Sequence, residues 1–352
     1  MKFLGYLIRK LGYALLTLFG VLSLVFFLFQ VLPDPAQLTM GQRSDLQSLE
    51  SARKEMGLDQ SVGEQYIAYL NDLSPLSYYS PQDSQIFNSG VVLSESSSGI
   101  VVLKSPYLRK SYQSRKPVSS ILSEAFEGTL VLAVFSMLIA VVFGIAFGAL
   151  AAFRYQRFLD KALLFVSTLG ISLPSFFAAI LIAWLFGFVW HRYTGLSMTG
   201  SLVDYSLSEG RHYVWANLLL PGIALGMRPL AIITQLTRSS MLEVMEQDYI
   251  VTAKAKGLSN WQIFRKHALR NALNPVVTSI SGWFASLLAG AFFVEYIFNW
   301  KGIGKVTVDA LEKADYPVVM GAVLLIASIF IVVNLVVDLF YKYLDPRVQL
   351  EA

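Results

Sequence analysis

The sequence contains no cysteine, and its three histidines, His191, His212 and His267, lie far apart along the chain. The missing thiols exclude disulfides, thiolate metal sites and a cysteine nucleophile. The histidines show none of the spacings that bind zinc or another metal ion, so we expect no metal site. Charge is scarce as well, because Asp, Glu, Lys and Arg make up only 15% of the 352 residues. Soluble proteins contain about 25% charged residues, so this composition is unusual for one.

Hydrophobic residues, in contrast, make up 55% of the chain, which indicates a membrane protein. The net charge of +4 is small, and the basic residues fall between apolar stretches rather than in one patch. This distribution argues against a nucleic-acid partner and favours the lipid bilayer. The first apolar stretch, Leu11–Leu32, is too long for the core of a signal peptide and ends at no small-residue cleavage site. We therefore predict a retained helix there.

Uncharged stretches long enough to cross a bilayer, which takes about 20 apolar residues of helix, recur along the chain. One further stretch is interrupted by Arg228 and Pro229. We count it as a span, because without it the basic segments before and after it could not both lie on the cytoplasmic side. The predicted spans are Leu11–Leu32, Gly128–Phe153, Ala162–Trp190, Val214–Thr237, Ala272–Val294 and Tyr316–Val337. The predicted fold class is an all-α integral membrane protein with about six transmembrane helices and a large external loop between the first two.

The basic residues predict the orientation, because Lys and Arg in short loops stay preferentially in the cytoplasm. They lie before the first span, between the second and third, and after the fourth. Both termini are therefore predicted to be cytoplasmic, with loops 33–127, 191–213 and 295–315 outside. The predicted parts are 1–32 (N-terminus and first helix), 33–127 (extracytoplasmic segment), 128–341 (core of five helices with cytoplasmic loop 238–271) and 342–352 (cytoplasmic tail).

Two further patterns concern the external segment and the packing of the second span. Segment 72–117 is rich in Ser and lacks clear periodicity, so we expect a partly flexible outer cap or docking surface that membrane insertion does not require. In the second span small residues recur every four positions, which favours close packing against another helix. These residues are Ala140, Gly144, Gly148 and Ala152.

Arg228 is the one charged residue near the middle of a predicted span. A charge at this depth is costly and usually faces a cavity or a partner. Two interpretations stay open: Arg228 lines a translocation path, or it supports an irregular helix beside Pro229.

The cytoplasmic segment 238–271 has the pattern of two short helices around a turn. Lys254 and Lys256 close the first helix, and Gly257 follows at the position where a left-handed residue ends a helix. Ser259 and Gln262 have the spacing of a capping box at the start of the second helix. The pattern predicts a rigid projection, although an amphipathic loop lying on the lipid surface is an alternative.

This segment resembles the coupling loop of binding-protein-dependent ABC importer permeases. The resemblance is carried by Asp248–Ile250, Thr252–Leu258 and His267–Pro275. It extends over nearly the whole chain, through Leu32–Ala36, Gly57–Asp59, Glu295–Gly304, Asp315–Pro317, Asn334–Tyr341 and Asp345–Arg347. The dipeptide, oligopeptide and nickel branch of the family is the most similar. The resemblance implies that the ATPase-coupling residues are Asp248, Thr252, Ala253, Ala255, Gly257, Leu258, Ser259, His267 and Asn271.

The family resemblance also implies a type I importer permease fold and a set of partners. These are a second homologous permease subunit, two cytoplasmic ATPase subunits that bind ATP and magnesium, and an extracytoplasmic substrate-binding protein. The implied location is a bacterial plasma membrane, which is the inner membrane in a Gram-negative cell. The chain itself is expected to bind no cofactor, because Gly302–Lys305 lacks the first Gly of a phosphate loop and is followed by Val306 rather than Ser or Thr.

The sequence departs from the family pattern outside the membrane. It lacks the Gly that usually separates Pro33 from Asp34, and segment 72–117 is longer than its counterpart. Short peptides are the expected substrate, with nickel chelates or another small solute as the alternative. A multi-pass membrane enzyme would need paired acids or a nucleophile with a base in its spans, and Asn334 with Asp338 favours helix packing instead. A membrane receptor or scaffold that binds a partner through loop 33–127 is the remaining alternative.

Overall fold

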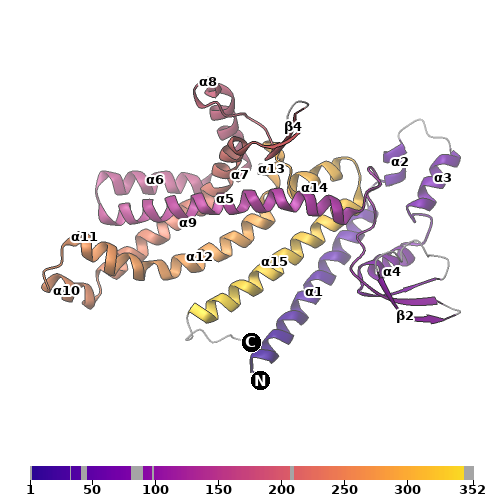
Figure 1. The fold of residues 1–352 in the computed structure, drawn as a ribbon, viewed down its shortest axis with the longest axis horizontal. Helices are drawn as coiled ribbons and strands as arrows, with labels where there is room; N and C mark the ends of the chain where they lie inside the picture. The colour runs from indigo at the N-terminus through magenta and orange to yellow at the C-terminus, as the bar shows by residue number, and fades with distance from the viewer. Residues whose placement is uncertain are drawn as a thin grey trace. The chain divides into compact units, whose positions relative to one another are not determined.

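The computed structural model describes residues 2–31, 33–40, 46–80, 90–96, 99–206 and 210–344. Most of these residues are helical (Figure 1). The chain divides into two compact units. Unit 1 comprises 1–125 with 306–327, and unit 2 comprises 126–305 with 328–352.

The helices of unit 1 begin with one long apolar helix. Within the apolar part of α1, Ile8–Val31, only Phe26 and Phe29 are buried, as expected of a helix whose surroundings are lipid. The next helices are short, and α4 begins with Ser61 and Glu64 in a reciprocal capping box. The unit contains α1 (Lys2–Val31), α2 (Pro35–Met40), α3 (Leu46–Glu55), α4 (Val62–Leu73) and the first turns of α15 (Tyr316–Leu344).

Unit 1 also contains a three-stranded antiparallel sheet with the order β1-β3-β2. Its strands are β1 (Leu76–Tyr79), β2 (Gly90–Ser96) and β3 (Gly99–Lys104). The sheet corrects the expectation of an all-α chain, and it gives part of 72–117 regular structure. Its strands are rich in Val, Ile and Tyr, which favour β-structure. Serines that flank and interrupt these short apolar runs hide them in the sequence.

Asp72 ties the sheet to the segment that follows it. Its carboxylate accepts hydrogen bonds from Arg109 Nε (2.8 Å) and the Tyr79 hydroxyl (3.2 Å), and its carbonyl accepts one from Lys104 Nζ (2.8 Å). Burial lowers the pKa of Lys104 and raises that of Tyr79. Arg109 and Lys104 are thus both anchored to Asp72, the first through its carboxylate and the second through its carbonyl.

The segment then reaches the start of α15, where Asp315 is almost completely buried. Ser111 Oγ and the Tyr112 N–H donate to the two oxygens of Asp315 over 2.5 and 2.9 Å. Removing 72–117 would leave this carboxylate without both donors, at a cost of about 1–3 kcal/mol or more. Deleting 72–117 would therefore disturb the start of α15 as well. Point substitutions on the sheet test the function of the segment without this side effect.

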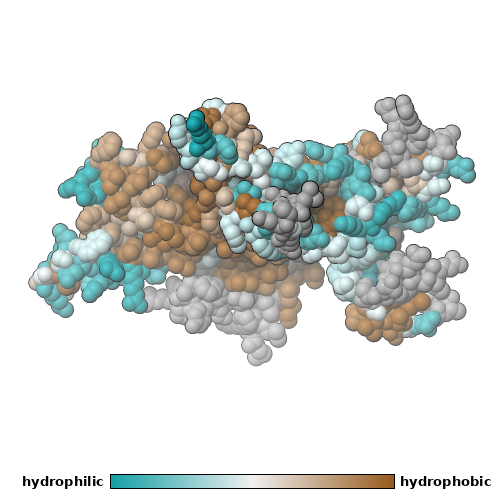
Figure 2. All heavy atoms as spheres, turned by 45° about the horizontal axis from the view of Figure 1, so that its top comes forward, coloured by the Kyte–Doolittle hydropathy of each residue, from teal (hydrophilic) through white to brown (hydrophobic). Residues whose placement is uncertain are grey.

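Unit 2 is built around α9, which lies against α6 and α12. Apolar side chains cover much of its surface in Figure 2. Its larger helices are α6 (Phe158–Ser172), α7 (Ser175–Ile182), α9 (Leu219–Met245), α12 (Leu269–Gly290), α13 (Phe292–Ile297) and most of α5 (Val118–Phe153). The first turn of α14 (Ile303–Glu312) also lies in unit 2, and the rest of α14 lies in unit 1. Shorter elements are the π-helix Ala183–Val189, α8 (His191–Thr194), the hairpin β4 (Val203–Ser206) and β5 (Gly210–Tyr213), and the 3₁₀-helix Trp215–Leu218.

The small residues of α5 pack as predicted. A Cβ atom on Gly144 would lie 2.8 Å from Ile233 of α9, and one on Gly148 would lie 2.5 Å from the carbonyl oxygen of Thr234. Ala140 is fully buried on the same face. The absence of side-chain atoms at the two glycines therefore lets α5 and α9 approach closely.

The membrane spans agree only in part with the predicted six. By length and hydropathy, four helices of the described chain could cross a membrane: Ile8–Val31, Val118–Phe153, Trp215–Met245 and Tyr316–Asp338. A bent pair, Phe158–Ser172 with Ser175–Val189, would make a fifth. The predicted third span is thus not one straight helix, because the chain bends by 111° at Leu173 and Pro174. The predicted fifth span corresponds to α12, whose polar residues keep it out of this set.

Glu295 joins α13 to the start of α14 and to α5, and its side chain is completely buried. One carboxylate oxygen accepts from Thr129 Oγ1 (2.7 Å), and the other accepts from the N–H groups of Gly304 (2.7 Å) and Lys305 (3.2 Å). These N–H groups belong to the first turn of α14, where no helical carbonyl is available to them. Glu295 therefore acts as a distant N-terminal cap for α14.

Candidate coupling site

Segment 238–271 forms the predicted pair of short helices, α10 (Asp248–Ala255) and α11 (Asn260–Gln262). They lie at one end of unit 2 in Figure 1. Gly257 in the turn between them has φ +79°, as its position after the helix predicts. A Cβ atom there would have no neighbour within 4 Å. The backbone conformation, rather than crowding within the chain, is what requires glycine at this turn.

The start of the second helix is capped as predicted. Ser259 Oγ accepts from the Gln262 N–H (3.3 Å), and Gln262 Oε1 accepts from the Ser259 N–H (3.0 Å). Helix α11 continues directly into a π-helix, Ile263–Ala268, and then into α12. The direction in which the chain leaves the turn is thus transmitted to a helix of the core without an intervening loop.

A buried apolar cluster holds the two helices in place. Ile250 and Ile263 are completely buried in it, and Trp261 stacks on Phe264 with ring centroids 6.0 Å apart. The cluster consists of Ala152, Met241, Ile250, Ala253, Ile263, Phe264, Ala268 and Ala272. Ala253 therefore packs inward against this cluster. Leu258 packs against the cluster, and Asp248, Thr252, Ala255, Gly257 and Ser259 are exposed.

His267 and Asn271 lie further along the same continuous helix. Asn271 Nδ2 donates to the Tyr249 hydroxyl of α10 (3.2 Å) and to the carbonyl of His267 (2.9 Å). This contact connects the two sides of the turn. Tyr249 was absent from the predicted site residues, although it stood within the motif that we used to define the site.

A buried ion pair at the base of the site was also missed. Arg238 of α9 binds Asp160 of α6 with two hydrogen bonds, from Nε to Oδ1 (2.6 Å) and from Nη2 to Oδ2 (2.9 Å). The Gln156 N–H donates to the same carboxylate (2.8 Å). Only 2% of the Asp160 side chain is exposed. Arg238, one of the basic residues that follow the fourth predicted span, thus fixes the end of α9 from which the coupling segment begins.

Arg228 lies on an exposed face of α9, apart from the coupling site. It makes no ion pair or side-chain hydrogen bond with any residue in the described part of the chain. Gln235 and Ser239 follow at helical spacing on the same face. On α12, Asn274 and Thr278 likewise share an exposed polar face. These polar faces suit water or another subunit better than lipid.

Comparison with known proteins identifies the family. The model described as a binding-protein-dependent transport system inner membrane component matches residues 144–350, and the model of the N-terminal part of such components matches 3–133. The dipeptide transport system permease protein DppB of Alkalihalophilus pseudofirmus is 32% identical, with 98% of this chain and 99% of that protein covered. The chain belongs to this permease family.

Other relatives of this permease agree in coverage. The di/tripeptide transport system permease protein DppB of Pseudomonas aeruginosa is 36% identical, and the glutathione transport system permease protein GsiC of Escherichia coli is 34% identical. Each match covers 98% of this chain and 99% of the relative. Among solved structures, the MetNI methionine ABC transporter in an inward-facing conformation superposes with a TM-score of 0.51 at 17% identity. That match covers 64% of this chain and 97% of the other, and it supports the fold.

Family membership confirms the broad prediction from the sequence. The chain is an inner-membrane subunit of an ABC importer, and the family works with a substrate-binding protein and ATPase subunits. Its relatives are transporter permeases rather than enzymes. The multi-pass enzyme that we considered is thereby set aside.

Proposed function

We propose that this permease imports short peptides across the plasma membrane. The relatives that match the whole chain include permeases of dipeptide, di/tripeptide and glutathione transport systems, and this observation carries the proposal. Nickel chelates or another small solute, handled by the same machinery, are the alternative substrate. A receptor or scaffold function is the alternative of a different class.

The proposed energy input comes from two cytoplasmic ATPase subunits, which bind the ATP and magnesium and contact the turn between α10 and α11. Two features support this contact: the exposed turn at Gly257 and the buried cluster that makes the surrounding helices rigid. A rigid projection can transmit a displacement, whereas a mobile loop would absorb it. The turn also leads without interruption into α12.

The proposed translocation path lies between this chain and a second, homologous permease subunit. The exposed polar face of α9, with Arg228, Gln235 and Ser239, supports this placement because lipid would not solvate it. Both termini are proposed to be cytoplasmic and 33–127 external. We further propose that the binding protein docks on the sheet, where Leu76, Leu103 and Val91 form an exposed apolar row across three strands.

The deciding experiment is uptake by the reconstituted complex. Both permeases are reconstituted in proteoliposomes, with the ATPases on one side of the membrane and the binding protein on the other. The binding-protein side is supplied with a labelled dipeptide, a labelled nickel chelate, or neither. ATP-dependent accumulation of the dipeptide is the expected result. Accumulation of the nickel chelate alone would favour the alternative substrate, and binding-protein capture without uptake of any solute would favour the receptor.

A further inference from the structure

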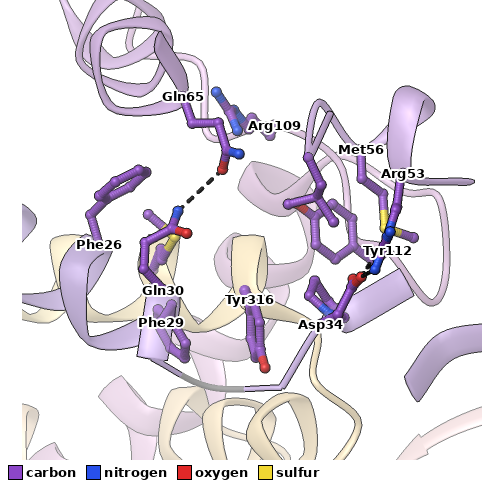
Figure 3. Close-up of a pocket in the computed structure, with 13 residues that line it drawn as sticks. Phe26, Phe29, Gln30, Asp34, Arg53, Met56, Gln65, Arg109, Tyr112 and Tyr316 are labelled. Carbon is purple, nitrogen blue, oxygen red and sulfur yellow. Dashed lines mark hydrogen bonds and ion pairs between the residues drawn. The ribbon is translucent and has the colours of Figure 1, made fainter. Parts of the chain in front are cut away.

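Unit 1 contains a cavity of about 280 Å³ that no part of the proposed coupling or translocation machinery uses. It lies at the C-terminal end of α1, and α1, α3, α4, α15 and the segment 105–117 all contribute to its lining (Figure 3). Its volume is near the lower end of ligand pockets, which run from roughly 300 to 1,000 Å³. A ligand the size of an amino acid or a dipeptide would fill it, whereas a phospholipid would not fit.

The polar groups of the cavity are of two kinds, and the first kind is already paired. Gln30 Nε2 donates to Gln65 Oε1 (3.1 Å) across one side, and Arg53 Nε donates to Asp34 Oδ2 (2.6 Å) on another, as the dashed lines in Figure 3 show. Asp34 also accepts from the Ala36 N–H (2.9 Å). The Asp34 and Arg53 charges therefore cancel, and neither residue gives the cavity a net charge.

The second kind consists of donors without a partner in the described structure. Arg109 uses only Nε, in its bond to Asp72, and its guanidinium lies over the Tyr69 ring at 5.8 Å. Its two Nη atoms donate to no described residue. The Tyr112 hydroxyl, in the same lining, likewise has no described hydrogen-bond partner. Burial raises the pKa of Tyr112, and the nearby Arg109 charge opposes that rise, so the hydroxyl stays a proton donor at neutral pH.

The backbone at Arg109 is also unusual. Its φ is +62°, a left-handed conformation that costs a residue with a side chain about 1 kcal/mol or more. The Val118 N–H donates to its carbonyl (3.1 Å), and Asp72 holds its Nε, so the guanidinium is fixed in orientation before any ligand arrives. Asp72 binds Arg109 through Nε alone, so the two Nη atoms stay available to another acceptor. An anion would therefore meet a guanidinium whose orientation is already fixed and whose two Nη atoms donate to no described residue.

We propose that this cavity binds the C-terminal carboxylate of a short peptide, with Arg109 Nη and the Tyr112 hydroxyl as its donors. A guanidinium can offer two parallel N–H donors to a carboxylate, and this geometry distinguishes it from a lysine. Phe26, Phe29 and Tyr316 supply aromatic surface for the side chain of the terminal residue. The choice of a peptide as the ligand rests on the proposed function, whereas the choice of a carboxylate rests on the cavity alone.

The test measures peptide binding to the full-length permease in neutral-lipid nanodiscs, without the binding protein. The labelled probes are Ala-Phe, its C-terminal amide and N-acetyl-Phe, and equilibrium dialysis measures their binding. Ala-Phe and N-acetyl-Phe should bind, and the amide should bind at least about tenfold more weakly, because only the amide lacks the charged partner of Arg109. Equal binding of Ala-Phe and its amide, or binding of neither, overturns the proposal.

Variants assign the site. Tyr112→Phe removes a hydroxyl that no described residue uses, so the fold should persist while Ala-Phe binding weakens roughly threefold to tenfold. Arg109→Gln should weaken it more than tenfold, and Tyr107→Phe, which changes a tyrosine of the same segment outside this cavity, should leave it unchanged. A loss with Tyr107→Phe but not with Tyr112→Phe would place the ligand elsewhere and refute the assignment.

Two further arms separate the possible sources of the anion. If nanodiscs containing phosphatidylglycerol compete with Ala-Phe, the occupant is a lipid headgroup. If the ligand-free binding protein competes, the occupant is an acidic side chain of that partner. Either result overturns the peptide proposal. Uptake by the whole complex is scored separately. Peptide uptake without carboxylate-dependent binding refutes this subsite alone, and carboxylate-dependent binding without peptide uptake refutes the proposed function alone.

Discussion

Replacing Glu295 with alanine should loosen the start of α14 without removing the protein from the membrane. The substitution takes away the acceptor of three hydrogen bonds, from Thr129 Oγ1, the Gly304 N–H and the Lys305 N–H. Thr129 in turn accepts from the Ile303 N–H (2.8 Å), so its position also depends on the carboxylate. The N–H groups of Gly304 and Lys305 would then lose the carboxylate as their acceptor.

The size of the effect follows from those three donors. At about 1 kcal/mol for each lost hydrogen bond, the local free energy of opening should fall by about 3 kcal/mol. Since about 1.4 kcal/mol corresponds to a factor of ten, amide exchange at Gly304 and Lys305 should accelerate roughly a hundredfold. Gly304 is already packed closely against α13, because a Cβ atom on it would lie 2.4 Å from Phe292 Cα.

Hydrogen–deuterium exchange of the purified permease, read by mass spectrometry over peptides that cover 300–310, measures this change directly. Glu127→Ala, which truncates an exposed glutamate of the nearby α5, is the matched control and should leave exchange unaltered. Exchange in Glu295→Ala within about threefold of the native rate would show that the carboxylate does not hold α14, and the reasoning would be refuted.

The same carboxylate predicts a dependence on pH. Burial raises the pKa of Glu295 above its ordinary value of 4.5. A carboxyl with a raised pKa contributes most to stability below the ordinary value, and it loses that contribution as pH rises toward the raised value. The melting temperature of the native protein, measured relative to Glu295→Gln, should therefore fall as pH rises from 4 upward. A difference that does not change with pH would mean that the group keeps its ordinary pKa.

Further predictions concern the proposed contacts. Gly257→Val should cost about 1–2 kcal/mol locally and insert normally, yet abolish retention of the ATPases in pull-down and substrate-stimulated ATP hydrolysis, whereas Lys254→Ala should do far less. Asp160→Asn should lower stability by about 3 kcal/mol in thermal melts, because the substitution removes the charge that pairs with Arg238 and puts an amide NH2 group where an oxygen accepted from Arg238 or the Gln156 N–H. Exposed Asp59→Asn is the neutral control. Leu103→Ser should weaken binding-protein affinity in a surface-immobilised assay, unlike Ile67→Ser on exposed α4. Cysteines introduced by Ser119→Cys and Ser197→Cys should react with an impermeant thiol reagent on intact cells, and labelling after Ala255→Cys would contradict the orientation.

The features that the sequence predicted well depend on neighbours in the chain. Gly257 must end a helix because of what precedes it, and the Ser259 capping box joins residues three apart, so both are visible in a short stretch of sequence. The stripe of small residues in α5 is similar, since helical spacing alone places Gly144 and Gly148 on one face. In each case the interaction is encoded by a fixed offset, and one sequence is enough to detect it.

The features that were missed join residues far apart in sequence, and no offset reveals them. Asp160 and Arg238 are separated by 78 positions and Thr129 and Glu295 by 166, although each pair forms a buried hydrogen bond of 2.7 Å or less. A buried charge in an apolar chain is nevertheless a signal by itself, because it is too costly to leave without a partner. Asp160 is the acidic residue closest to the start of its helix, and Glu295 directly follows an apolar stretch, so both could have been marked as requiring partners. What the sequence withholds is the identity of those partners, and the same limit applies to Arg109, whose unused Nη atoms are apparent only once Asp72 is known to occupy Nε.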